Sequence, residues 1–184
     1  TRSGSVTGVQ TCALPISQSG LDTTHQAHID QGGDSNSASI SQDGSSLIND
    51  AEIIQLGAGN DAAIAQQGAD GENTAFITQQ GAGNQAGITQ EHIGAIVLGN
   101  IAAITQNGTL NAANITQNGG GHAANILQDG ANNDGAVNQS DSGQQAILKQ
   151  IGDNNSGSIS QSGPASAVAV DQFGSGMSIV IDQH

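Results

Sequence analysis

The stretch "NTAFITQQGAGNQAGITQ", residues 73 to 90, contains one short pattern twice. Asn73, Ala75, Ile77 and Gln79 are followed eleven residues later by the same four residue types. The glutamine serves as a marker, and its spacing alternates between 13 and 11 residues, is 16 once, and is 11 thereafter. Almost the whole chain is therefore one array. The marker occurs at Gln18, Gln31, Gln42, Gln55, Gln66, Gln79, Gln90, Gln106, Gln117, Gln128, Gln139, Gln150, Gln161, Gln172 and Gln183.

Around each marker the template is N-x-A-x-I-x-Q-x-G, which alternates with a period of two residues. A period of two is typical of a β-strand, so the template residues share one face. The residues between them vary, and we expect them to face solvent. The constrained face is predicted to form a thin core of alanine and isoleucine. These core residues are Ala51, Ile53, Ala62, Ile64, Ala75, Ile77, Ala86, Ile88, Ala102, Ile104, Ala113, Ile115, Ala124 and Ile126.

The strands are joined by short links of four or six residues that contain glycine. Glycine adopts positive φ without steric cost, so these residues are expected in turns. The unit is then strand, turn, strand, turn, and it buries its core only when successive copies stack. The predicted turn glycines are Gly57, Gly68, Gly81, Gly108, Gly119, Gly130, Gly152, Gly163 and Gly174.

The sequence predicts an all-β fold: a β-solenoid of stacked strand-turn-strand repeats with two facing, parallel, in-register sheets. A buried amide is costly when its donors are unpaired. In an in-register stack, each side-chain amide can bond the same residue one level above and below, as in steric zippers. We therefore predict a structural amide ladder. Its members are Asn49, Gln55, Asn60, Gln66, Asn73, Gln79, Asn84, Gln90, Asn100, Gln106, Asn111, Gln117, Gln128, Gln139, Gln150, Gln161, Gln172 and Gln183.

Two segments depart from the array. Residues 6 to 16, "VTGVQTCALPI", resemble the conceptual translation of a sequencing adapter, so residues 1 to 16 are expected to be an artefactual, unstructured leader. The array then occupies residues 17 to 184, and any signal peptide is missing from the record. Residues 91 to 99, "EHIGAIVLG", break the spacing and are either a degenerate repeat or a bulged insertion. The last residues, "MSIVIDQ", still follow the strand alternation without a visible cap.

Composition excludes several classes of function. The net charge is −14 with only two basic residues, which argues against nucleic-acid binding. No apolar run reaches the roughly 18 residues of a membrane span. No nucleophile, base or phosphate loop is recognisable, so we expect neither enzymatic activity nor a cofactor.

The array resembles the curlin repeat family, the bacterial amyloid subunits of curli fibres. The family pattern Q-x-G-x-x-N-x-A-x-x-x-Q is matched in full at residues 55–66, 79–90 and 106–117, and in part from Gln18 to Gln183. The resemblance implies a secreted subunit that polymerises with itself at the cell surface into biofilm and adhesive fibres. It also implies a nucleator subunit, an outer-membrane secretion pore and export chaperones as partners. Asp171 and Asp182 make the end of the chain acidic, which favours a major-type subunit.

Other interpretations remain open at this stage. Aspartates beside glycine in the turns are compatible with calcium, although they do not recur at fixed positions. Histidines could suggest a zinc site. His25 and His28 lie close together, but the other histidines fall in unrelated repeats. Thr78, Thr89, Thr105 and Thr116 precede the marker and are expected to form one short outer column, not the paired threonine ranks that an ice-binding surface needs. The alternative function is a capped monomeric β-solenoid that acts as an adhesin or an ice-binding protein.

Overall fold

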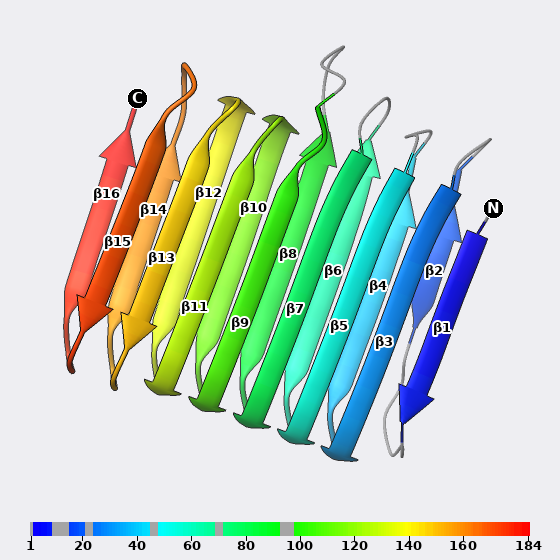
Figure 1. Cartoon of the computed structure of the whole chain (residues 1–184), viewed down its shortest axis with the longest axis horizontal. Coiled ribbons are helices and arrows are strands. Elements are labelled where there is room, and N and C mark those ends of the chain that lie inside the picture. The colour runs from blue at the N-terminus through cyan, green and yellow to red at the C-terminus, as the bar shows by residue number, and fades with distance from the viewer. Residues whose placement is uncertain (1, 9–14, 21–23, 45–47, 69–71, 93–97) are drawn as a thin grey trace.

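The structure is a computed structural model and describes residues 2–8, 15–20, 24–44, 48–68, 72–92 and 98–184. Within these ranges it contains sixteen strands and no helix. One sheet has the order β1-β3-β5-β7-β9-β11-β13-β15, and the other has β2-β4-β6-β8-β10-β12-β14-β16. Figure 1 shows that the strands progress from β1 and β2 at one end of the long axis to β15 and β16 at the other.

The first sheet, called sheet A below, contains the odd-numbered strands, and sheet B contains the even-numbered ones. Sheet A consists of β1 (Arg2–Gly8), β3 (Thr24–Asp34), β5 (Ile48–Ala58), β7 (Glu72–Ala82), β9 (Ile101–Thr109), β11 (Ala123–Ala131), β13 (Gln145–Ile151) and β15 (Ala167–Phe173). Sheet B consists of β2 (Ile16–Ser19), β4 (Ser37–Asp43), β6 (Asp61–Gly68), β8 (Gln85–His92), β10 (Ala112–Gly120), β12 (Asp134–Ser142), β14 (Ser156–Gln161) and β16 (Ser178–Gln183).

Every strand pairs in parallel with the strand two places away in the chain, and the repeats are in register. Ile77, for example, lies beside Ile53 on β5 and Ile104 on β9. In the other sheet, Ile88 lies between Ile64 and Ile115. The predicted fold, a β-solenoid of two parallel in-register sheets, is confirmed.

The core between the sheets is built from the alanine and isoleucine columns. All the predicted core residues are buried, and the most exposed of them, Ala86 and Ala113, are only 7 % exposed. Small alanines let the two sheets approach closely, while each fully buried isoleucine contributes roughly 1.5–3 kcal/mol of hydrophobic stabilisation. In β12, β13 and β15 the isoleucine position is taken by Val137, Leu148 and Val170, which are also buried.

The irregular segment adds no level to the stack. β8 ends at His92 and β9 begins at Ile101, yet β7 pairs directly with β9 and β8 with β10. The extra residues are therefore accommodated in the link between the sheets, and the degenerate-repeat interpretation is wrong. Residues 93–97 of this segment lie outside the described residues.

The first residues also differ from the expectation. Residues 2–8 form β1 and pair with β3, in a register that sets Gly4 beside Ala27 and Val6 beside Ile29. Ile16 begins β2 and lies beside Ile40. The described part of residues 1–16 is thus not an unstructured leader. Without β1, this edge of β3 would present unpaired backbone groups, and an extended segment with the right alternation can bond to them.

All the predicted turn glycines have positive φ, between 86° at Gly163 and 133° at Gly68. At Gly57 (φ 121°) a Cβ atom would also collide with the backbone carbonyl of Gly81, one level further along the stack. At Gly59 (φ 66°), in the same link, a Cβ would meet nothing within 4 Å. The first glycine of the link is thus required by stacking as well as by backbone conformation.

We predict that Gly57→Ala destabilises the fold by about 3 kcal/mol or more, because strain and a backbone collision act together. Gly59→Ala is the matched control and is expected to cost only about 1–2 kcal/mol, the ordinary cost of a left-handed alanine. Denaturant unfolding of the soluble chain measures both. Equal losses of unfolding free energy in the two variants would contradict the predicted collision between levels.

Candidate functional site

The most distinctive feature of the interior is a pair of glutamine ladders, one on each sheet. Along each ladder, Nε2 of one glutamine donates a hydrogen bond to Oε1 of the glutamine on the next level. The distances are 2.7 Å from Gln55 to Gln79 and 3.2 Å from Gln161 to Gln183. Sheet A carries Gln31, Gln55, Gln79, Gln106, Gln128, Gln150 and Gln172. Sheet B carries Gln18, Gln42, Gln66, Gln90, Gln117, Gln139, Gln161 and Gln183.

From Gln42 to Gln172 the ladder amides also donate across the core to backbone carbonyls, except that Gln161 donates to the hydroxyl of Ser166, and the sequence did not predict these bonds. Nε2 of Gln79 on β7 donates to the backbone carbonyl of Asp61 on β6, at 3.1 Å. Nε2 of Gln66 on β6 donates to the carbonyl of Asp50 on β5, at 3.0 Å. These amides thus bond along the stack and also tie one sheet to the other, so both protons of a buried amide are satisfied.

The asparagines that precede the sheet B strands act differently from the glutamines. Oδ1 of Asn60 accepts from both the backbone N–H and the Nδ2 of Asn84, at 3.0 and 3.1 Å. Nδ2 of Asn84 then donates to the carbonyl of Gly108 in the turn of the next level, at 3.0 Å. These side chains therefore fasten the turns of successive levels. The column consists of Asn36, Asn60, Asn84, Asn111, Asn133 and Asn155.

The asparagine column at the start of the sheet A strands is interrupted, so the predicted continuous ladder needs correction here. Neither side-chain atom of Asn49, nor Nδ2 of Asn73, has a hydrogen-bond partner among the described residues. Nδ2 of Asn100, in contrast, donates to the carbonyl of Gly119 at 2.9 Å. The difference follows the link that leads into the equivalent residue one level further. That link has four residues for Asn100, which is followed in the column by His122, but six for Asn49 and nine for Asn73. A longer link does not bring its glycine carbonyl to the amide.

His122 and Gln144 continue this second column in place of asparagine. Nδ1 of His122 accepts the backbone N–H of Gln144, and its backbone N–H donates to Oδ1 of Asn100, at 3.3 and 3.1 Å. The imidazole can therefore accept a hydrogen bond, as an asparagine oxygen does, only when it is neutral and carries its proton on Nε2, which faces the carbonyl of Asn118. Burial lowers the pKa of His122, partly offset by that carbonyl and by Asp141.

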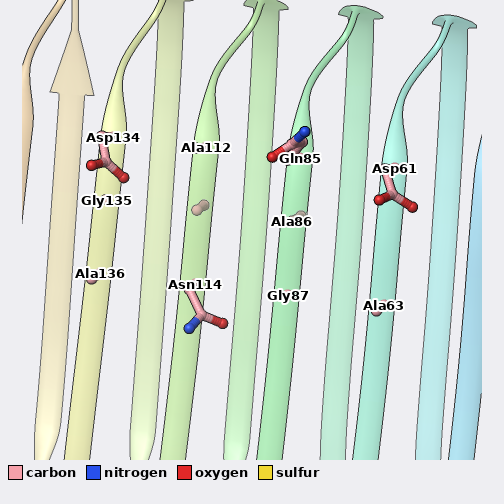
Figure 2. A pocket seen from close by; sticks show the side chains of 11 residues that line it. Asp61, Ala63, Gln85, Ala86, Gly87, Ala112, Asn114, Asp134, Gly135 and Ala136 are labelled. Carbon is pink, nitrogen blue, oxygen red and sulfur yellow. The ribbon is translucent and has the colours of Figure 1, made fainter.

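The outer surface assembles no cluster of catalytic or metal-binding groups among the described residues. Figure 2 shows the groove over sheet B, of about 300 Å³, with Asp61 and Asp134 at opposite ends. They lie three strand spacings apart, roughly 14 Å, which is too far for a carboxylate pair to share one reacting atom. No group of three potential metal ligands occurs in the described ranges. Two turn aspartates, Asp141 and Asp153, instead accept backbone N–H groups of Gly163 and Ala131, at 2.7 and 2.8 Å.

The four threonines do not form the single column that the sequence analysis expected. Thr78 pairs with Thr105 on sheet A, whereas Thr89 pairs with Thr116 on sheet B. Successive copies of the template alternate between sheets, so the threonines make two separate pairs on opposite faces.

These features define a parallel β-solenoid whose polar interior is hydrogen-bonded along its axis and between its sheets. Comparison with known proteins adds no name to this class: no family model, no curated protein and no solved structure matches the chain. In the described part of the chain, no helix has the length and apolar character to cross a membrane.

We predict that Gln79→Glu destabilises the fold by about 3 kcal/mol or more, because it replaces two buried donors with an acceptor or a charge. The neighbouring exposed residue supplies the control: Gln80→Glu points outward and is expected to change stability by less than about 0.5 kcal/mol. Equal unfolding midpoints for the two variants in a denaturant titration would contradict a bonded ladder.

We also predict that stability falls in acid through His122. Because the folded pKa of His122 lies below the unfolded value, the unfolded chain binds the proton first, and the free energy of unfolding drops as the pH falls below about 6.5. His122→Asn restores the column residue and is expected to reduce the loss between pH 8 and pH 5. An identical pH dependence of the unfolding free energy in the two proteins would rule out this role.

Proposed function

We propose that this protein is the structural subunit of an extracellular, curli-like amyloid fibre that grows by end-to-end stacking of solenoid turns. The observation that carries the proposal is the continuity of the glutamine ladders from the first levels of the stack to Gln172 and Gln183. The contact between two levels inside the chain is a parallel, in-register pairing with matched amides. A second copy can repeat that contact without any new chemistry.

The strands at the end of the stack are suited to this contact. β15 and β16 are the last strands of their sheets, so each has one edge that pairs with no other strand of the described chain. The inward residues Ile179 and Ile181 on β16 are only partly buried, whereas the equivalent Ile159 one level below is fully buried. A further level would cover these side chains and bond the open backbone edge, which lowers the free energy by both routes.

The cellular role and the partners follow from the resemblance to curlin repeats. On this proposal the subunit supports the biofilm matrix and adhesion, is secreted through an outer-membrane pore with export chaperones, and is seeded by a nucleator. The net charge of −14 supports it, because like-charged chains resist association until a template aligns them.

We predict that Ile181→Asp blocks fibre growth, because it places a carboxylate in the column that the next level must cover. Val180→Asp is the matched control, since Val180 lies on the same strand, points outward and is 76 % exposed. Thioflavin fluorescence and fibre diffraction, with a meridional reflection at about 4.8 Å, measure growth. Equal growth of both variants would contradict stacking at this end. A wild-type chain that stays a soluble monomer would contradict the fibre and favour the adhesin or ice-binding alternative.

A further inference from the structure

The two outer faces of the solenoid differ sharply in chemistry. Nine large hydrophobic residues of the described chain are exposed, and six of them lie at outward positions of sheet A strands. Sheet B contributes only Val180, at its last strand, and otherwise presents mostly serine, alanine, threonine and acidic or amide residues. The exposed hydrophobic residues of sheet A are Ile48, Leu56, Phe76, Ile101, Ile147 and Phe173.

Between the asparagine and glutamine columns, the middle strands of sheet A carry no acidic residue, in a chain that has sixteen. We call the outward residues of β7, β9, β11 and β13 between the asparagine and glutamine columns the central face. It carries one charge, the ammonium group of Lys149, which lies 5.1 Å from the ring centre of Phe173 on β15. The central face consists of Thr74, Phe76, Thr78, Ile101, Ala103, Thr105, Ala123, Asn125, Leu127, Gln145, Ile147 and Lys149.

Acidic residues border this face rather than enter it. Asp50 and Glu52 lie on β5, and Asp171 lies on β15. Glu72 on β7 and Asp129 on β11 lie just outside the two columns. Two copies with a net charge of −14 repel one another over most of their surface. The central face is where a second copy of the same chain can approach without setting carboxylates directly against carboxylates. Charge therefore opposes a contact between like faces less here than over the rest of the surface.

The shape of the face suits such a contact. A groove of about 270 Å³ lies over β11, with Ala123 at its floor, Ile101 on one wall and Ile147 on the other. A face with both protruding isoleucines and an alanine-lined groove can pack against its own copy in a two-fold, isologous arrangement. The central face spans three strand spacings by the length of strand between the two columns, roughly 14 by 20 Å. Its projected area of about 300 Å² is smaller than what each partner buries in a stable protein interface, so we expect a weak contact that depends on protein concentration.

We propose that the central face of sheet A binds the same face of a second copy, so that two solenoids pair side by side. This contact is separate from end-to-end stacking, because it uses outward side chains and not strand edges or ladder amides. It gives the protein an interaction surface for itself whether or not fibres grow.

Two matched substitutions test the proposal. Asn125→Asp adds one carboxylate at the centre of sheet A, and Asn114→Asp adds the same carboxylate at the equivalent exposed position of β10 on sheet B. Both residues point outward, so neither change disturbs the core. Ile147→Asp serves as a second, stronger variant of the central face. Sedimentation velocity measures the mass of each soluble protein over a range of concentrations.

We expect the wild type and Asn114→Asp to form dimers, and Asn125→Asp and Ile147→Asp to weaken dimerisation by about tenfold or more, since like charges at a contact oppose it. A monomeric wild type, equal weakening by both asparagine substitutions, or an unchanged Ile147→Asp dimer would overturn the proposal. Fibre growth is scored separately. Dimers without fibres would support side-by-side pairing and contradict the fibre proposal. Fibres whose mass per length is that of one solenoid would support the fibre proposal and contradict side-by-side pairing.

Discussion

The structure depends on the hydrogen bonds of buried side-chain amides between levels. Gln79 accepts from Gln55 and donates to Gln106 and to the carbonyl of Asp61, so three neighbours must be in place at once. A slip of one residue would turn every inward side chain outward. A slip of two would set glutamine beside isoleucine and leave its donors unpaired in the core. The amides thus contribute more to the uniqueness of the register than the hydrophobic core does, because alanine and isoleucine tolerate neighbours of other kinds.

The sequence was sufficient to predict the strands, their inward faces and the glutamine ladders, because all three follow from one period and one repeated residue type. It did not reveal how side chains bond across the core, since that depends on the stagger between the sheets. Gln66, for instance, donates to the carbonyl of Asp50, and these two residues do not occupy equivalent positions of the repeat. The threonines were misassigned for a related reason: residues that are neighbours in the repeat lie on opposite sheets, and those that touch are two repeats apart.

Inward and outward positions obey different constraints, and this separates two kinds of association. An inward residue must match the residues above and below it, so it is nearly the same at every level. An outward residue meets solvent and can vary, which allows Phe76 and Ile147 on one sheet while Asp61 and Asp134 lie on the other. End-to-end contacts therefore draw on the repeated interior, whereas lateral contacts draw on the variable surface. Changes to one need not alter the other.

Link length makes the two halves of the stack unequal. Where the link into the next level has four residues, a glycine carbonyl reaches the amide of the level before it, as Gly119 reaches Asn100 and Gly163 reaches Gln144. Where that link is longer, as between Asn49 and Asn73, the amide donor has no partner in the described chain. In the half that ends at β15 and β16, Asn155 also accepts the backbone N–H of Met177 at the last level, although Oε1 of Gln144 has no partner in the described chain. The four-residue links thus add hydrogen bonds between levels that the longer links do not, so the levels of this half are tied together by more side-chain bonds than those around Asn49 and Asn73.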